Sequence, residues 1–135
     1  MTPAIVNPTE LHDPTGFGYS HTARALGELV FVAGQYGSDE TGRTASPDFA
    51  AQVERSFANL GTALRAVGLD YPDVVRIGTY IVDHDQEKLE TLVATVRRIW
   101  GDTPPAQTLV GVAALALPDM LFEVEAVAVR APVAG

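Results

Sequence analysis

The segment FEVEAVAV, residues 122–129, decides the fold class because its apolar and acidic residues alternate with the period of a β-strand. Every second side chain of an extended segment points to the same side, so one face carries Phe122, Val124, Ala126 and Ala128. The opposite face carries two carboxylates and two valines, which are Glu123, Glu125, Val127 and Val129. If the apolar set meets helices, both carboxylates point away from them. In a monomer both carboxylates would be solvated. In an oligomer at least one would lie at an interface, where a carboxylate must be paired or hydrogen-bonded or must have a shifted pKa.

Strand and helix patterns alternate on the N-terminal side of this segment. The last strand is predicted over residues 121–129, and further strands are predicted at residues 20–24, 28–35, 74–82 and 108–114. A long helix is predicted to start at Ser46, with Pro47 in its first turn, and to be closed by Gly68. A second helix is capped by Asp83 or Asp85 and carries an apolar stripe at helical spacing. The order β-β-α-β-α-β-β predicts an α+β domain in which two helices cover one face of one sheet.

Both faces of the predicted sheet are apolar. Within residues 28–35, Leu29 and Phe31 oppose Val30 and Val32. A half-solvated antiparallel sheet normally alternates apolar and polar side chains. Because each predicted helix has a single apolar stripe, the two helices can cover only one face. No chain is left to cover the other face, so we expect a homo-oligomer.

The composition excludes several classes of protein. The 135 residues are 47% apolar and 19% charged, which predicts a single globular domain over residues 1–135. The absence of cysteine excludes disulfides, a thiolate nucleophile and cysteine-ligated metals. The net charge of -8 disfavours nucleic-acid and anionic-membrane partners, and no apolar run is long enough to span a bilayer. Because the start lacks the pattern of a secretory signal, the expected location is cytoplasmic.

The three histidines are candidates for chemistry. Residues 83–85, Asp-His-Asp, have metal-ligating side chains, but helix capping by the aspartates is the better explanation and we expect no metal site. His12 lies in a loop rich in turn-forming residues and is expected to be solvated. Tyr19 and His21 share one face if residues 20–24 form a strand. They then form either a hydrogen-bonding wall for a ligand or a strand edge half-covered by the preceding loop.

Several segments taken together resemble the RidA (YjgF-like) family. The resemblance runs in order over about residues 16–130. It is carried by residues 18–21 (GYSH), 31–35 (FVAGQ), 52 and 59–60 (Q and NL), 68–83 (GLDYPDVVRIGTYIVD), 105–108 (PAQT) and 122–129 (FEVEAVAV). These segments are similar to the family's early tyrosine motif, its strand ending in Ser-Gly-Gln, its Pro-Ala-Arg-Ser block and its closing strand. Each segment is weak alone, whereas the ordered set is specific.

The resemblance implies a chorismate-mutase-like fold with one mixed β-sheet. It also implies a homotrimer with a central β-barrel, helices outside and one cleft between each pair of subunits. Enzymes of the family hydrolyse reactive enamines and imines, such as 2-aminoacrylate, to 2-oxo acids and ammonia, without a metal or organic cofactor. In them an arginine binds the substrate carboxylate, the first glutamate of the last strand positions water, and the early tyrosine lines the pocket.

Carried onto this sequence, the resemblance implies catalytic roles for Glu123 and Tyr19 and substrate-binding roles for Gln107, His21, Ala33 and Thr108. Gln107 stands at the arginine position, and Ala33 stands at the serine of Ser-Gly-Gln. Arginine offers a carboxylate a charged bidentate fork, whereas glutamine offers one neutral donor group. The exchange predicts that 2-imino acids bind more weakly, by about 1–2 kcal/mol or more. A protonated His21 is a candidate to compensate.

Three functions are consistent with these residues. The first is a cofactor-free hydrolase of a small reactive enamine or imine, in which Tyr19 and Gln107 orient the substrate and Glu123 holds the attacking water. The second is a non-catalytic small-molecule-binding or regulatory protein that retains the cleft. The third is an endoribonuclease, a description that some relatives carry and that the acidic charge disfavours.

Overall fold

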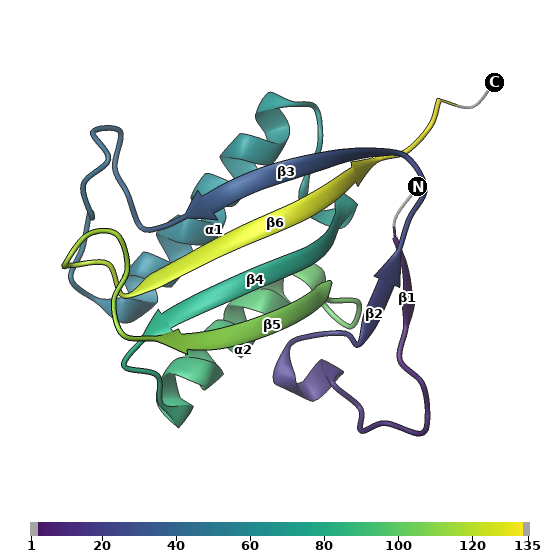
Figure 1. The fold of residues 1–135 in the computed structure, drawn as a ribbon, viewed down its shortest axis with the longest axis horizontal. Coiled ribbons are helices and arrows are strands. Elements are labelled where there is room, and N and C mark those ends of the chain that lie inside the picture. The colour runs from purple at the N-terminus through teal and green to yellow at the C-terminus, as the bar shows by residue number, and fades with distance from the viewer. Residues whose placement is uncertain (1–2, 134–135) are drawn as a thin grey trace.

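The computed structural model describes residues 3–133, which form six strands and two helices (Figure 1). In chain order, the elements are β1 (Ala4–Val6), β2 (Thr22–Arg24), β3 (Glu28–Gln35), α1 (Phe49–Ala66), β4 (Val74–Val82), α2 (Gln86–Trp100), β5 (Ala106–Val112) and β6 (Phe122–Arg130). Two short 3-10 turns, Thr15–Phe17 and Tyr71–Asp73, precede β2 and β4. The strands predicted at residues 28–35 and 74–82 are confirmed with the same bounds.

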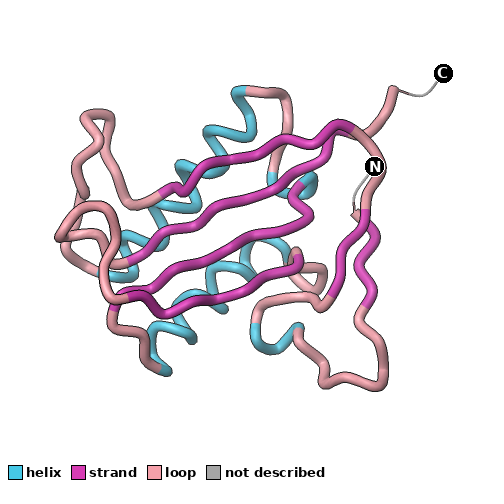
Figure 2. The backbone as a smooth tube through the Cα atoms, viewed as in Figure 1, coloured by secondary structure: helices cyan, strands magenta, loops and turns pink. Residues whose placement is uncertain are grey.

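Four strands form the main sheet in the order β3-β6-β4-β5. β6 lies in the middle and is antiparallel to both β3 and β4, whereas β4 and β5 are parallel. A parallel pair needs a crossover connection, and α2 provides it. Both helices lie behind the same face of the sheet (Figures 1 and 2). The predicted α+β fold, one mixed sheet covered on one face by two helices, is therefore confirmed.

The hydrophobic core lies between this sheet face and the helices. The apolar face predicted for the last strand is buried, with Phe122 and Val124 fully inaccessible. From α1, Val53, Phe57, Leu60 and Leu64 pack into the same core, and α2 contributes Leu92 and Val96. Burial of these side chains is the main source of folding free energy, because each contributes roughly 1.5–3 kcal/mol. The core thus fixes which face of β6 is turned outward.

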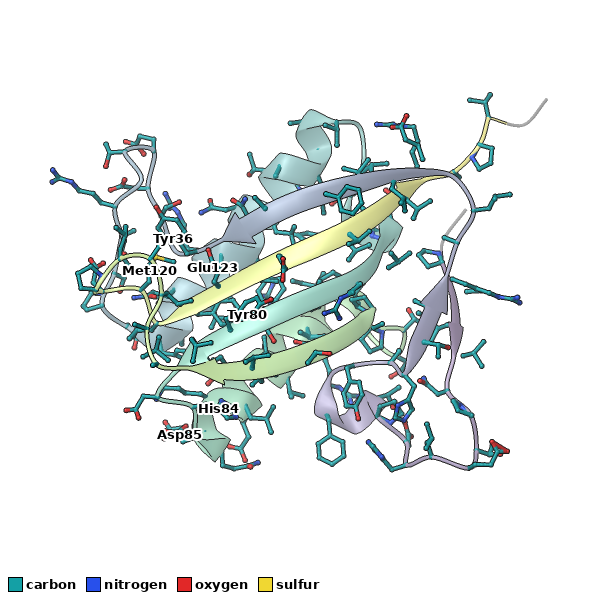
Figure 3. The ribbon with its side chains drawn as sticks, viewed as in Figure 1. Tyr36, Tyr80, His84, Asp85, Met120 and Glu123 are labelled. Atoms are coloured by element: carbon teal, nitrogen blue, oxygen red, sulfur yellow. The ribbon has the colours of Figure 1, made fainter. Side chains whose placement is uncertain are left out.

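The other face of the sheet is open within this chain, and Figure 3 looks onto it. On β3, Phe31 is 73% exposed and Leu29 is 58% exposed. Glu123 and Glu125 belong to the same face, opposite the buried side chains of β6. Large exposed apolar residues on a contiguous face are typical of an interaction surface. The contact of this face with other copies of the chain remains a prediction.

The helix N-termini differ in part from expectation. Asp48, not Ser46, caps α1, because its carboxylate accepts a hydrogen bond from the Ala51 amide at 2.9 Å. Ser46 instead accepts from the amide of Asp48 at 3.1 Å, so both residues are of capping type but the helix begins two residues later. Of the two candidates for α2, Asp85 is the cap, accepting from the Lys88 amide at 2.8 Å.

The N-terminal strands were the least predictable part of the fold. β1 was not expected, and it pairs with β2 in a separate two-stranded antiparallel sheet. β2 begins at Thr22 rather than at residue 20, while Ser20 makes an isolated parallel bridge to Ala106. Three-residue strands leave no periodic signal, so only their tertiary partners reveal them. The strand predicted at residues 108–114 is β5, which covers Ala106–Val112 and is thus shifted by two residues toward the N-terminus.

Candidate functional site

A cavity of about 430 Å³ lies between α2, β5 and the loop that precedes β2. Three residues with expected site roles, Tyr19, Gln107 and Thr108, line it together. Its apolar walls come from Phe17, Leu89, Leu92 and Leu109, and its fourth polar residue is His12. An apolar cavity with a few convergent polar groups is the usual form of a small-molecule site. We call it the α2–β5 cavity.

The backbone around Tyr19 is anchored to the start of β5 on both sides. The Gly18 carbonyl accepts a hydrogen bond from Gln107 Nε2 at 2.9 Å. Ser20 is buried, donating its amide to the Pro105 carbonyl at 3.1 Å and its hydroxyl to the Pro104 carbonyl at 2.6 Å. These contacts join residues more than 80 positions apart in the chain and place the phenol over the cavity.

The side-chain amide of Gln107 is bonded within the protein at both ends. Its Oε1 accepts from the Thr79 hydroxyl at 3.0 Å, and its Nε2 donates to Gly18 as described above. One N–H of the amide remains free to bind a ligand. This N–H is a neutral donor, whereas arginine would offer a charged pair of donors. Gln107 therefore positions the loop that carries Tyr19 and offers a carboxylate little beyond one hydrogen bond.

Histidines 12 and 21 form an aromatic cluster with Tyr19. The rings of Tyr19 and His21 lie 5.5 Å apart, so the two side chains are neighbours, although both residues lie before β2 and share no strand face. The Nε2 of His21 nevertheless bonds to the His12 backbone oxygen at 2.9 Å, and His21 is not among the residues that line the cavity. His12 does line it, and its Nε2 lies 2.6 Å from the Tyr19 hydroxyl oxygen. His12 is exposed, as expected, but its place at the cavity was not predictable because a turn-rich loop has no periodicity that would place its side chains.

Glu123 lies apart from the cavity, on the open face of the sheet. A methyl group added to Gly34 would come within 2.6 Å of Glu123 Oε2, so the carboxylate packs directly on the β3 backbone next to Ala33. Burial, with a smaller contribution from the charge of Glu125, raises the pKa of Glu123 above its ordinary value of 4.5. Glu123 and Ala33, two of the expected site residues, therefore lie close together.

The second carboxylate of β6 has a different partner. The Tyr80 hydroxyl of β4 donates a hydrogen bond to Glu125. This bond, together with burial, raises the pKa of Tyr80 above its ordinary value of 10.0. Within residues 3–133, no side-chain hydrogen bond is made to the Glu123 carboxylate, so it is Glu123 that remains available to water or a ligand.

The expected site residues form two groups that cannot meet in one chain. Gln107 pairs with Ile77 of β4, whereas Glu123 pairs with Tyr80 of the same strand. Three residues along β4 and two strand spacings separate them by about 14 Å. An odd separation along a strand also puts their side chains on opposite faces of the sheet. A ligand that touches both groups needs two copies of the chain.

Glu123→Gln is expected to increase the free energy of unfolding at neutral pH. Because the folded-state pKa of Glu123 is raised, the wild type loses stability as the pH rises from 4.5 through the higher folded value, and neutral glutamine avoids this loss. Urea denaturation at about pH 3.5 and pH 7.5, at one protomer concentration, measures the difference. An equal advantage of the variant at both pH values would contradict the assignment.

The Asp-His-Asp segment at residues 83–85 is occupied by structural contacts. Asp85 caps α2, and Lys88 Nζ donates to the Asp83 carbonyl at 2.6 Å. In the described part of the chain, no group of three His, Cys, Asp or Glu residues is arranged to hold a metal ion. None of the helices between residues 3 and 133 combines the length and apolar character needed to cross a membrane.

Comparison with known proteins agrees with the fold of the chain. The family model described as Endoribonuclease L-PSP matches residues 12–130. The RutC family protein YjgH of Escherichia coli is 37% identical over 111 residues, which cover 82% of this chain and 81% of that protein. The human 2-iminobutanoate/2-iminopropanoate deaminase is 28% identical over 120 residues, covering 88% of this chain and 85% of that protein.

A solved structure is similar over nearly the whole chain. The Yersinia pestis protein YyfB, described as a protein of unknown function of the conserved Rid protein family, superposes with a TM-score of 0.91 at 35% identity. The match covers 96% of this chain and 100% of that one. On sequence and structure alike, the chain belongs to the RidA (YjgF-like) family.

Proposed function

We propose that this chain is a cofactor-free hydrolase that converts a small reactive enamine or imine to a carbonyl compound and ammonia. Its sites lie between the subunits of a homotrimer, and its specificity is shifted away from 2-imino acids. The observation that carries the proposal is Glu123, a half-buried carboxylate with a raised pKa and no side-chain hydrogen-bond partner among the described residues. A carboxylate with a raised pKa accepts a proton from water more readily than an ordinary carboxylate does.

The chemistry needs positioning and proton transfer. Water adds to the C=N carbon of the imine while Glu123 accepts one of its protons. The carboxyl group then returns this proton to nitrogen, which gives a carbinolamine. Glu123 next carries the hydroxyl proton of the carbinolamine to its amino nitrogen, so the C–N bond breaks, the carbonyl forms and ammonia leaves. Positioning by the walls of the α2–β5 cavity lowers the entropic cost of bringing the reactants together. The proposal is supported by the similarity to the human 2-iminobutanoate/2-iminopropanoate deaminase.

Two features support a site shared between copies of the chain. Tyr19 and Gln107 on one side and Glu123 and Ala33 on the other are too far apart to act on one small molecule within one subunit. The open sheet face that carries Glu123 also exposes Phe31 and Leu29. Burying this face against a second copy removes apolar surface from water and brings the two groups of residues together.

The proposed specificity follows from the hydrogen bonds of Gln107. With Oε1 bonded to Thr79 and one N–H bonded to Gly18, the side chain has one neutral donor left for a substrate. Charged hydrogen bonds contribute about 1.5–3 kcal/mol, against about 0.5–1.5 kcal/mol for neutral ones. Glutamine in place of arginine therefore costs a substrate without a carboxylate little binding free energy. A 2-imino acid, in contrast, loses its charged hydrogen bonds to the arginine. A ribonuclease is disfavoured because the net charge of -8 repels a phosphate backbone.

Ammonia release from 2-aminoacrylate and from a non-carboxylated imine tests the proposal. The wild type is expected to prefer the non-carboxylated imine, and Gln107→Arg is expected to raise kcat/KM for 2-aminoacrylate by about tenfold. Gln107→Met, which keeps the length of the side chain but lacks its donor, is the control and should not show this gain. Inactivity of the wild type and of Gln107→Arg on every imine, combined with thermal stabilisation by substrate analogues, would replace the hydrolase by a non-catalytic binding protein.

A further inference from the structure

His12 is a polar group of the α2–β5 cavity to which the proposed hydrolysis assigns no role. Its Nε2 lies 2.6 Å from the Tyr19 hydroxyl oxygen. The loop that carries His12 is held by His21, whose Nε2 lies 2.9 Å from the His12 backbone oxygen and whose amide donates to Asn7 Oδ1 at 2.7 Å. Because a carbonyl oxygen can only accept, His21 carries a proton on Nε2. The His21 ring thus positions the His12 ring against Tyr19.

The hydrogen bond between His12 and Tyr19 has a preferred direction. The Nε2 of His12 lies within hydrogen-bond distance of the Tyr19 hydroxyl oxygen, at 2.6 Å, and a phenol donates to the unprotonated nitrogen of a neutral imidazole. Phenol is also a stronger acid than neutral imidazole, and imidazole is a stronger base than phenol. The single hydroxyl proton of Tyr19 is then donated to His12, and the hydroxyl oxygen can only accept hydrogen bonds from the cavity side.

We infer that His12 makes Tyr19 a hydrogen-bond acceptor toward the cavity, so that the site selects ligands that present an N–H group there. Imines, iminium ions and primary amides have this N–H, whereas ketones and esters of the same shape do not. Phe17, Leu89, Leu92 and Leu109 surround the polar end and suit an apolar remainder of the ligand. The inference rests on the proposed function in placing an imine in the α2–β5 cavity, but it requires no turnover.

The charged groups near His12 are directed elsewhere. The Asp13 carboxylate accepts from the hydroxyl and the amide of Thr15, at 2.7 and 3.0 Å. Arg97 of α2 donates to the Thr15 carbonyl at 3.3 Å. Both charges are therefore engaged with the same short turn and not with the phenol. His12 is the side chain that sets the direction of the Tyr19 hydrogen bond.

Two small aromatic probes of nearly equal shape test the inference. Benzamide presents an N–H group where acetophenone presents a methyl group, and both carry the same carbonyl. In NMR titrations of the full-length wild type above neutral pH, benzamide is expected to bind about three- to tenfold more tightly. His12→Phe preserves an aromatic ring against Phe17 and frees the Tyr19 proton for donation, so the preference should vanish or reverse. Tyr19→Phe should bind both probes alike.

His84→Phe is the matched control, because His84 is an exposed histidine outside the cavity and the same change there should leave the ratio unaltered. Equal binding of the two probes by the wild type, an unchanged ratio in His12→Phe, or no binding of either probe would overturn the inference. The readout is binding, so it separates the two proposals. A catalytically inert wild type with the expected preference contradicts only the hydrolase, and an active enzyme without the preference contradicts only the role of His12.

Discussion

Replacing Glu123 by glutamine is expected to lower kcat/KM for imine hydrolysis by about 100- to 10,000-fold, the usual contribution of a positioned general acid–base. Glutamine keeps the length and shape of the side chain but cannot accept a proton from water and return it to nitrogen. The raised pKa of Glu123, caused by burial and by the charge of Glu125, makes this exchange easier near neutral pH than for an ordinary carboxyl group. Initial rates of ammonia release over a range of substrate concentrations measure the loss.

Glu125→Gln is the matched control for this prediction. Glu125 lies two residues along the same face of β6, and its carboxylate accepts from the Tyr80 hydroxyl. The same chemical change there should cost far less activity than at Glu123. A Glu123→Gln variant that keeps a tenth or more of the wild-type kcat/KM, or a Glu125→Gln variant that loses as much, would show that Glu123 is not the proton carrier.

Mixing two inactive variants tests whether the site is shared between copies. In an equal mixture of Glu123→Gln and Tyr19→Ala protomers, unfolded together and refolded, about one quarter of the inter-subunit sites should contain an intact Tyr19 and an intact Glu123. Recovery of activity toward this fraction is expected. If the mixture stays as inactive as its parents while forming trimers by light scattering, the site lies within one chain.

Gln52→Leu is expected to lower the free energy of unfolding by about 2–4 kcal/mol, because it leaves buried polar groups of the backbone without partners. Gln52 is 1% exposed on α1. Its Nε2 donates to the carbonyls of Ser46 and Asp119 at 2.9 and 3.0 Å, and its Oε1 accepts from the Leu121 amide at 2.8 Å. Leucine has a similar volume, so the loss measures the hydrogen bonds more than a cavity. Urea denaturation at one protomer concentration gives the value.

The control is Gln86→Leu, an identical change at an exposed position near the start of α2, where the effect should stay within about 0.5 kcal/mol. Gln52 also bears on the site, since it holds Leu121, two residues before Glu123. We therefore expect Gln52→Leu to lower activity as well as stability. A Gln52→Leu variant as stable as Gln86→Leu would mean that water or a rearranged loop replaces the lost hydrogen bonds.

The sequence by itself determined the layers of the fold. The period-two pattern of residues 122–129 identified the buried and open faces of β6, and the apolar stripes of the two helices showed that only one face is covered. These features depend on short-range periodicity, which can be recognised in the sequence without any tertiary information. The bounds of β3 and β4 were predictable for the same reason, whereas the three-residue β1 was not.

The tertiary structure alone decided how the candidate site is built. The bond from Gln107 to Gly18 spans 89 positions, and the bond from Gln52 to Leu121 spans 69. Neither bond can be predicted from a local sequence pattern, because a side-chain hydrogen bond between distant segments depends on how the chain folds and not on the spacing of residues along it. The same holds for His12, which meets Tyr19 in a loop that is bonded to His21, itself bonded to Asn7. Periodicity therefore settled which side of each element faces the core, and long-range hydrogen bonds settled which side chains meet.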